Sequence, residues 1–202
     1  MPSQAVLLVN LGSPDSPSVP DVRRYLREFL SDPSVLDAPW LIRQFVLNIF
    51  ILPFRPQKSA EAYQKIWLKE GSPLVVMSKR VQSLLQEKVD LPVELAMRYG
   101  NPSIPQVVQR LLDQKTGEIL LVPLYPHYAM SSYETVVAKV REVLIAKASR
   151  IGLRILPPFY DDPDYLQSLV ASAREYLKQN YDHLLFSFHG LPERHLKQAD
   201  PS

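Results

Sequence analysis

The sequence predicts an α/β fold, in which a parallel sheet is flanked by helices. Short, wholly apolar runs such as 119–124 recur between helical patterns in the second half of the chain. Such runs are typical of strands that are buried on both faces of a parallel sheet. Helix starts between them are marked by Ser-x-x-Gln at 103–106 and Ser-x-x-Glu at 131–134. This alternation of strands and helices favours a doubly wound sheet.

The elements can be placed along the chain from apolar spacing and from the breakers between them. We expect strands at 5–11, 93–97, 119–124, 153–156 and 184–188. We expect helices that begin near Pro20, Trp40, Ser59, Pro73, Ser103, Ser131 and Asp162. Roughly 80 residues, mostly helical, separate the first two strands, far more than a normal crossover needs. This long helical insertion is expected to build a wall of a binding site.

Composition excludes several classes of function. The net charge is only +2 and no face forms a basic stripe, so a nucleic-acid partner is not expected. The chain has no cysteine, which excludes disulfides, thiolate zinc sites and Cys-ligated iron–sulfur clusters within it. It also lacks G-x-G-x-x-G, G-x-x-x-x-G-K-[ST], G-x-S-x-G and H-E-x-x-H, so no nucleotide, nucleophile-elbow or zinc-protease motif is present.

The longest apolar stretch is Trp40–Phe54, which is interrupted by Arg43, Gln44 and Asn48. It is too short to span a bilayer, which needs about 18 or more apolar residues. Its first interpretation is a core helix, and a ligand-facing wall or a membrane-contacting lip is the alternative. The N-terminus has no basic segment followed by a long apolar one, as a signal peptide would. We therefore expect a soluble, cytoplasmic protein, with peripheral membrane association as the alternative.

Chemically useful residues follow the expected strands. In open α/β sheets, ligands bind beyond the carboxyl ends of the strands. Arg98 and Tyr99 follow one strand, Tyr125 to Tyr128 follow another, and His189 follows the last. Each also has a plainer interpretation, because a lone histidine is more often structural and an Arg-Tyr pair more often joins two elements. The remaining histidines are interpreted as structural or solvated: His127, His183 and His195.

Five segments, in order along the whole chain, resemble the ferrochelatase family. FSFHGLP at 186–192 is similar to the segment that carries the family's active-site histidine. The others are VLLVNLGSPDSP at 6–17, YQKIWLKEGSPL at 63–74, MRYGNPSI at 97–104 and VPLYPHYAMSSYETV at 122–136. The resemblance covers about the first 60% of a family member.

This resemblance implies the activity of a lyase, protoporphyrin ferrochelatase, which inserts Fe²⁺ into a porphyrin in the terminal step of haem synthesis. It implies a Rossmann-like, chelatase-type fold of two domains that bind no nucleotide. On that basis residues 1–180 are expected to form the N-terminal domain, and 181–202 to begin a second domain that is truncated here. A chain that lacks half of the cleft is expected to have little activity alone.

Site residues are carried over from the resemblance position by position. His189 matches the family histidine that takes a pyrrole proton, binds the metal, or both. Arg98 and Tyr99 match residues that line the cleft beside it. Leu11 matches a residue against the macrocycle face, and Trp40–Phe54 matches the apolar lip that admits the porphyrin. Positions near the porphyrin propionates are matched by Tyr63, Ser72 and, more loosely, Arg55.

Two alternatives to a protoporphyrin ferrochelatase stay open at this stage. One is a chelatase for another metal or tetrapyrrole, with coproporphyrin among the candidate substrates. The other is a non-catalytic tetrapyrrole-binding protein. The family's acidic partner of the histidine has no counterpart in this chain, and the sequence does not determine the oligomeric state.

Overall fold

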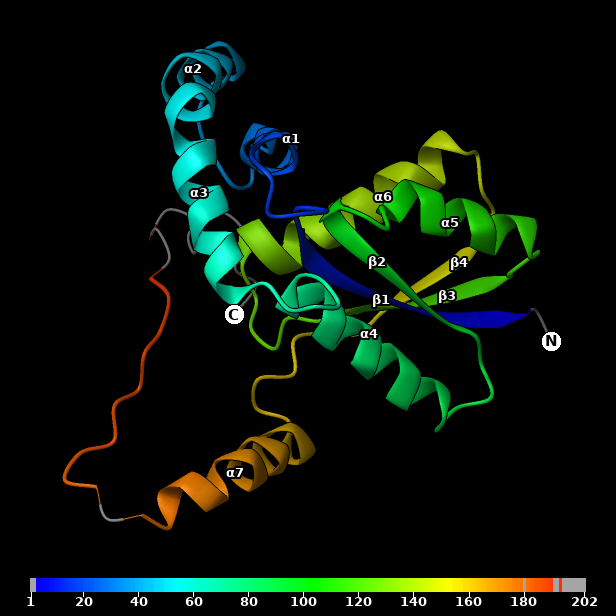
Figure 1. Cartoon of the computed structure of the whole chain (residues 1–202). Coiled ribbons are helices and arrows are strands. Elements are labelled where there is room, and N and C mark those ends of the chain that lie inside the picture. Colours follow the sequence, from blue (N-terminus) through cyan, green and yellow to red (C-terminus); the bar gives the residue numbers. More distant parts are fainter. Residues whose placement is uncertain (1–2, 180, 191–192, 194–202) are drawn as a thin grey trace.

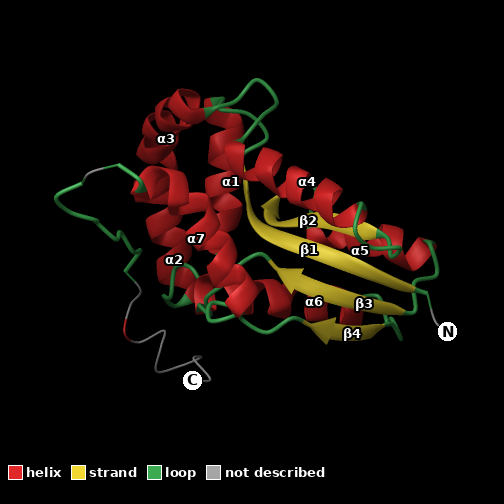
Figure 2. Ribbon diagram, turned by 90° about the horizontal axis from the view of Figure 1, so that it is seen from below, coloured by secondary structure: helices red, strands yellow, loops and turns green. Residues whose placement is uncertain are grey.

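A four-stranded parallel sheet forms the centre of the computed structural model, which describes residues 3–179, 181–190 and 193. The strands lie in the order β2-β1-β3-β4, and every neighbouring pair is parallel (Figure 2). Their bounds are Gln4–Ser13 for β1, Val93–Gly100 for β2, Glu118–Pro123 for β3 and Gly152–Ile155 for β4. This arrangement confirms the α/β fold that the sequence predicts.

Helices cover both faces of the sheet. Figure 1 shows α5 (Ile104–Asp113) and α6 (Thr135–Ala146) on one face and α4 (Pro73–Gln86) on the other. Alternate residues of β1 point to the two layers: Leu7 belongs to the core under α5 and α6, whereas Leu8 belongs to the core under α4. Because both faces are buried, β1 is apolar without interruption from Ala5 to Val9.

The insertion after β1 folds into a helical arm. Its helices are α1 (Val19–Ser31), α2 (Trp40–Val46) and α3 (Leu52–Ile66), and a π-helical turn at Leu47–Ile51 joins the last two. The arm is fixed to the sheet by an apolar cluster that includes Val22, Leu47 and Tyr99. In Figure 1, α2 stands at the end of the arm that is farthest from the sheet.

Two predicted helix caps are wrong. Ser59 lies inside α3, which begins at Leu52 and has Pro53 in its first turn. Proline is favoured in a first turn, where its missing N–H leaves no hydrogen bond unmade, so it is a stronger start signal than a serine six residues later. Ser131 lies in a π-helical turn, Met130–Glu134, and α6 begins only at Thr135. The other two predicted caps are confirmed: Ser103 with Gln106 forms a capping box, and Asp162 caps α7.

The predicted strand at 184–188 is also wrong. These residues pair with no strand among the described residues, and Leu185 and Phe188 are 90% and 83% exposed. A strand requires a partner for its backbone hydrogen bonds. The preceding helix, α7 (Pro163–Leu177), stands apart from the sheet (Figure 1) and has no buried residue, so it does not return the chain to the edge of β4.

Half of the segment assigned to a second domain, 181–202, lies outside the described residues. The boundary at 180 therefore stays a prediction, and His195 lies outside the described residues. Among the described helices, none is both long and apolar enough to cross a bilayer.

Candidate functional site

The carboxyl ends of the strands are brought together by two glycines with positive φ. Gly12, at φ +102°, ends β1 beside Tyr99 of β2, and a β carbon at Gly12 would lie 1.8 Å from the Tyr99 carbonyl oxygen. Gly100, at φ +80°, similarly passes the Ser13 carbonyl oxygen. Only glycine allows this conformation and this approach together. The glycines therefore bring the end of β2, which carries Arg98 and Tyr99, directly against the end of β1.

Arg98 and Tyr99 meet at one buried carboxylate, that of Asp32. The Tyr99 hydroxyl donates to Oδ2 of Asp32 at 2.8 Å, and Arg98 Nη2 donates to the same oxygen in an ion pair. The Thr135 hydroxyl donates to it as well, at 2.7 Å. Arg98 Nε in turn donates to Oγ1 and the carbonyl oxygen of Thr135, at 2.8 and 3.1 Å. This set of four side chains is called the Asp32 network below.

The network keeps its groups in defined charge states. Burial opposes ionisation of Asp32, but hydrogen bonds from Thr135, the Ser34 amide and Tyr99, together with the charge of Arg98, outweigh it and lower the pKa of this carboxyl. Burial also raises the pKa of the Tyr99 phenol well above its usual value, although Arg98 opposes the shift. At neutral pH the network thus holds an ionised Asp32 and a neutral Tyr99. The Arg98 guanidinium also lies 4.4 Å from the Tyr99 ring centre.

A depression of about 360 Å³ opens over the Asp32 network. It is lined by all four members of the network, and Lys139 and Glu142 of α6 lie at it too. Arg98 and Tyr99, which the sequence predicts as site residues, are therefore brought together beside a hollow that a ligand group can enter.

A second hollow, of about 470 Å³, contains His189. Its lining comes from the loop after β3, Tyr125 to Ala129 with Ser132, and from Phe188 and His189. The sheet order places the change in chain direction between β1 and β3, which is where ligands bind in open α/β sheets. His189 is exposed and does not end a strand, but it reaches the expected edge of the sheet. His127, in the same lining, stacks on Tyr160 at 5.4 Å between ring centres.

The other predicted residues lie on the arm side of the sheet edge. Leu11 and Tyr63 both pack, partly buried, against the apolar cluster that contains Tyr99. Arg55 is exposed on α3, close enough to lower the pKa of Tyr63, although burial of that phenol has the larger effect and raises it. Ser72 is buried just before α4 and is 5% exposed. Leu11, Tyr63 and Tyr99 are thus gathered, whereas Ser72 lies at the start of a different helix.

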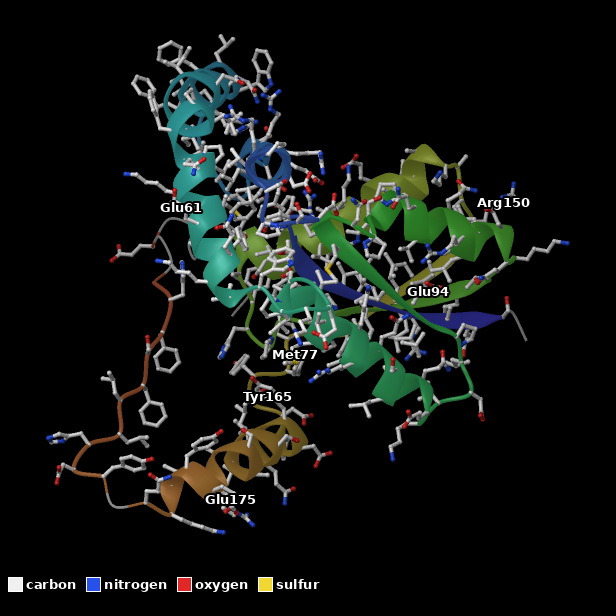
Figure 3. All side chains as sticks on the ribbon, in the orientation of Figure 1. Glu61, Met77, Glu94, Arg150, Tyr165 and Glu175 are labelled. Atoms are coloured by element: carbon white, nitrogen blue, oxygen red, sulfur yellow. The ribbon has the colours of Figure 1, made fainter. Side chains whose placement is uncertain are left out.

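The segment Trp40–Phe54 is not the core helix of the first interpretation. Figure 3 shows side chains, aromatic rings among them, standing out from the end of the arm. Seven large apolar residues there are between 51% and 72% exposed: Trp40, Leu41, Ile42, Phe45, Ile49, Phe50 and Phe54. We call these seven residues the apolar patch. Of the apolar residues in this segment, only Leu47 and Leu52 are buried, and they pack against α1.

Comparison with known proteins assigns the family. The family model for ferrochelatase matches residues 3–201. The chain belongs to the ferrochelatase family. It is 53% identical to the ferrochelatase of Pseudomonas entomophila strain L48, 54% to that of Pseudomonas putida strain W619 and 53% to that of Azotobacter vinelandii strain DJ. Each match covers all of this chain but only 60% of the relative, so the chain spans about 60% of the length of these curated ferrochelatases.

Family membership confirms the resemblance, but the sequence had not indicated every member of the site. Asp32 and Thr135 are absent from the predicted site residues, although they hold two that were predicted. Asp32 stands in Ser-Asp-Pro-Ser at the end of a helix, which by itself indicates only a turn. Tyr125, which the sequence places after a strand, has a hydroxyl that is buried without a hydrogen-bond partner among the described residues. No group of three or more His, Cys, Asp or Glu is arranged among those residues to hold a metal ion.

Proposed function

We propose that this chain forms the porphyrin-binding, histidine-bearing part of a protoporphyrin ferrochelatase, a lyase for which Fe²⁺ and the porphyrin are both substrates. Membership of the ferrochelatase family is the observation that carries the proposal. The two hollows at the sheet edge support it, since one contains Arg98 and Tyr99 and the other contains His189. As part of this proposal, residues 1–180 are the N-terminal domain and 181–202 begin the second.

The residues supply what metal insertion needs. A flat macrocycle admits a metal only after it is distorted and has lost two pyrrole protons, so a rigid wall that favours the distorted ring lowers the barrier. Leu11 and Tyr63 are proposed to contact the ring face from the arm cluster. Arg55, with Tyr63 and Ser72, is proposed to bind the propionates, because a guanidinium pairs well with carboxylates. The free imidazole of His189 suits either acceptance of a pyrrole proton or ligation of the entering metal.

The apolar patch is proposed as a lip that admits the porphyrin and contacts a membrane surface. Monomeric soluble proteins rarely expose so many large apolar side chains together, and such patches mark interaction sites. The patch lies on one projecting end of the molecule, and none of the described helices is both long and apolar enough to cross a membrane. A poorly soluble macrocycle could then pass from the bilayer to the sheet edge.

The test is metallation of protoporphyrin, followed by the fluorescence of the zinc product. Zn²⁺ replaces Fe²⁺ in the assay because it is not oxidised. This chain is assayed beside the product of its complete reading frame, since its curated relatives are longer. We expect metallation by the longer product, little by this chain alone, and loss of activity in His189→Ala with porphyrin affinity retained. His183→Ala, another exposed imidazole in the same segment, is the matched control.

Two results would redirect the proposal. A folded, porphyrin-binding long product that metallates nothing would identify a non-catalytic carrier. Faster metallation of coproporphyrin, or a strong preference for another metal, would identify a different chelatase.

A further inference from the structure

Asp32 joins three elements through one oxygen atom. It follows the last turn of α1, while its Oδ2 accepts hydrogen bonds from Arg98 and Tyr99 at the end of β2 and from Thr135 at the start of α6. Its other oxygen, Oδ1, accepts the Ser34 amide at 2.7 Å. A carboxylate offers acceptor sites for about four hydrogen bonds, and Asp32, which is 8% exposed, already accepts four from within the protein.

Arg98 is held on two sides by the same group of residues. Nη2 is fixed by Asp32, and Nε is fixed by Thr135, whose own hydroxyl is fixed by Asp32. The remaining nitrogen, Nη1, has no hydrogen bond to the described residues. Because the guanidinium is planar and rigid, fixing two nitrogens determines the direction of the third. Tyr99 is fixed by the same carboxylate, since it is only 1% exposed and its hydroxyl donates to Asp32.

We propose that Asp32 is a positioning residue, which orients Arg98 toward the substrate in the hollow beside it, with Tyr99 and Thr135 completing the clamp. This inference rests on the proposed function, which makes Arg98 substrate-facing. Asp32 does not touch the reacting atoms. It also balances the charge of Arg98.

The first test is steady-state metallation by Asp32→Asn in the product of the complete reading frame. Asparagine keeps the shape and one acceptor oxygen but leaves Arg98 without its counter-ion. We expect kcat to fall at least tenfold while KM for the porphyrin falls or changes by less than threefold. Thr135→Val should also lower kcat, because it removes the hydroxyl that donates to Asp32. Thr135→Ser, which keeps that hydroxyl, should retain the wild-type kcat.

Two controls separate positioning from general destabilisation. Asp90→Asn removes an exposed carboxylate and should leave kcat unchanged. Val107→Ala makes a cavity in the core under α5 and serves as a destabilised reference outside the network. An equal fall of kcat in Val107→Ala would overturn the inference, and so would wild-type kcat in Asp32→Asn.

A second measurement does not depend on activity. The Nε–H proton of Arg98, observed by NMR in ¹⁵N-arginine-labelled protein and assigned with Arg98→Lys, reports directly on the clamp. We expect it to exchange at least tenfold faster in Asp32→Asn, and at the wild-type rate in Asp90→Asn. Unchanged exchange would overturn the inference even in an active enzyme. If the wild-type protein metallates nothing, the proposed function fails, while the exchange rate still shows whether Asp32 holds Arg98.

Discussion

Gly12 passes so close to Tyr99 that a β carbon on Gly12 would lie 1.8 Å from the Tyr99 carbonyl oxygen. Both residues are in the sheet, and they are register partners at the ends of β1 and β2. This contact fixes the end of β1, which carries Leu11, against the end of β2, which carries Arg98. The site therefore depends on the absence of a side chain at position 12 as much as on the side chains around it.

Gly12→Ala is expected to destabilise the protein by at least about 3 kcal/mol, because the substitution combines a positive φ with a backbone clash. The measurement is the urea midpoint of unfolding, followed by circular dichroism. Gly71→Ala is the matched control, since Gly71 also has a positive φ, +128°, but no atom lies within 4 Å of its added β carbon. We expect it to cost about 1 kcal/mol, from strain alone. Equal losses in the two variants would contradict the role of the clash.

The ionised state of Asp32 gives a prediction about pH. Its pKa is lowered in the folded protein, so its stabilising effect is complete above the unfolded value near 3.8 and is lost as the pH falls through the folded value. Asp32→Asn should therefore be about 3 kcal/mol less stable than wild type at pH 7, as is usual when one partner of a buried ion pair is removed.

The difference between the two proteins should stay constant down to about pH 5 and narrow only below pH 3.8. Urea unfolding at a series of pH values measures it. Asp90→Asn, at an exposed position, should follow wild type throughout. A difference that is the same at pH 3 and pH 7 would show that the lost charge is not the cause.

How far the sequence predicts this molecule depends on whether a feature is local. The first four strands, the capping box at Ser103 and the cap at Asp162 were predicted and confirmed, because apolar runs and caps are properties of neighbouring residues. Asp32 could not be predicted as a centre of the site. Its partner Arg98 is 66 residues away, and only the fold brings them together.

The predictions that were wrong also depended on contacts that the local sequence does not contain. An apolar run such as 40–54 has the same composition whether it is buried or forms an exposed patch. The elements packed around it therefore decide whether it is buried. The segment 184–188 has the composition of a strand, but a strand also needs a partner for its backbone groups. Ser131 has capping-box spacing, but the chain forms a π-helical turn there, so the spacing alone does not determine the helix start.

The contrast between Ser103, which forms a capping box, and Ser131, which caps no helix, can be tested. Ser103→Ala removes a working capping box and should cost about 1 kcal/mol of unfolding free energy. Ser131→Ala, where no side chain caps α6, should cost less than about 0.5 kcal/mol. Thermal or urea unfolding compares them directly. A larger loss for Ser131→Ala would mean that the sequence pattern, rather than the π-helical turn, describes this helix start.

The apolar patch leads to a prediction about membranes. Phe45 and Phe50 meet edge to face at 5.9 Å and are 59% and 58% exposed, so they form a compact aromatic unit at the end of the arm. Transfer of each ring into a lipid surface should contribute about 1.5–3 kcal/mol. Replacement of both by serine should therefore weaken binding to phosphatidylcholine–phosphatidylglycerol vesicles by roughly 100-fold or more, as measured by co-sedimentation.

Leu84→Ser is the matched control, because Leu84 is 60% exposed on α4, outside the patch, and its loss should not change vesicle binding. Since neither ring is buried, both variants should unfold at the wild-type urea concentration. Vesicle binding that is undiminished in the double variant, or absent from the wild-type protein, would show that the patch does not contact a membrane.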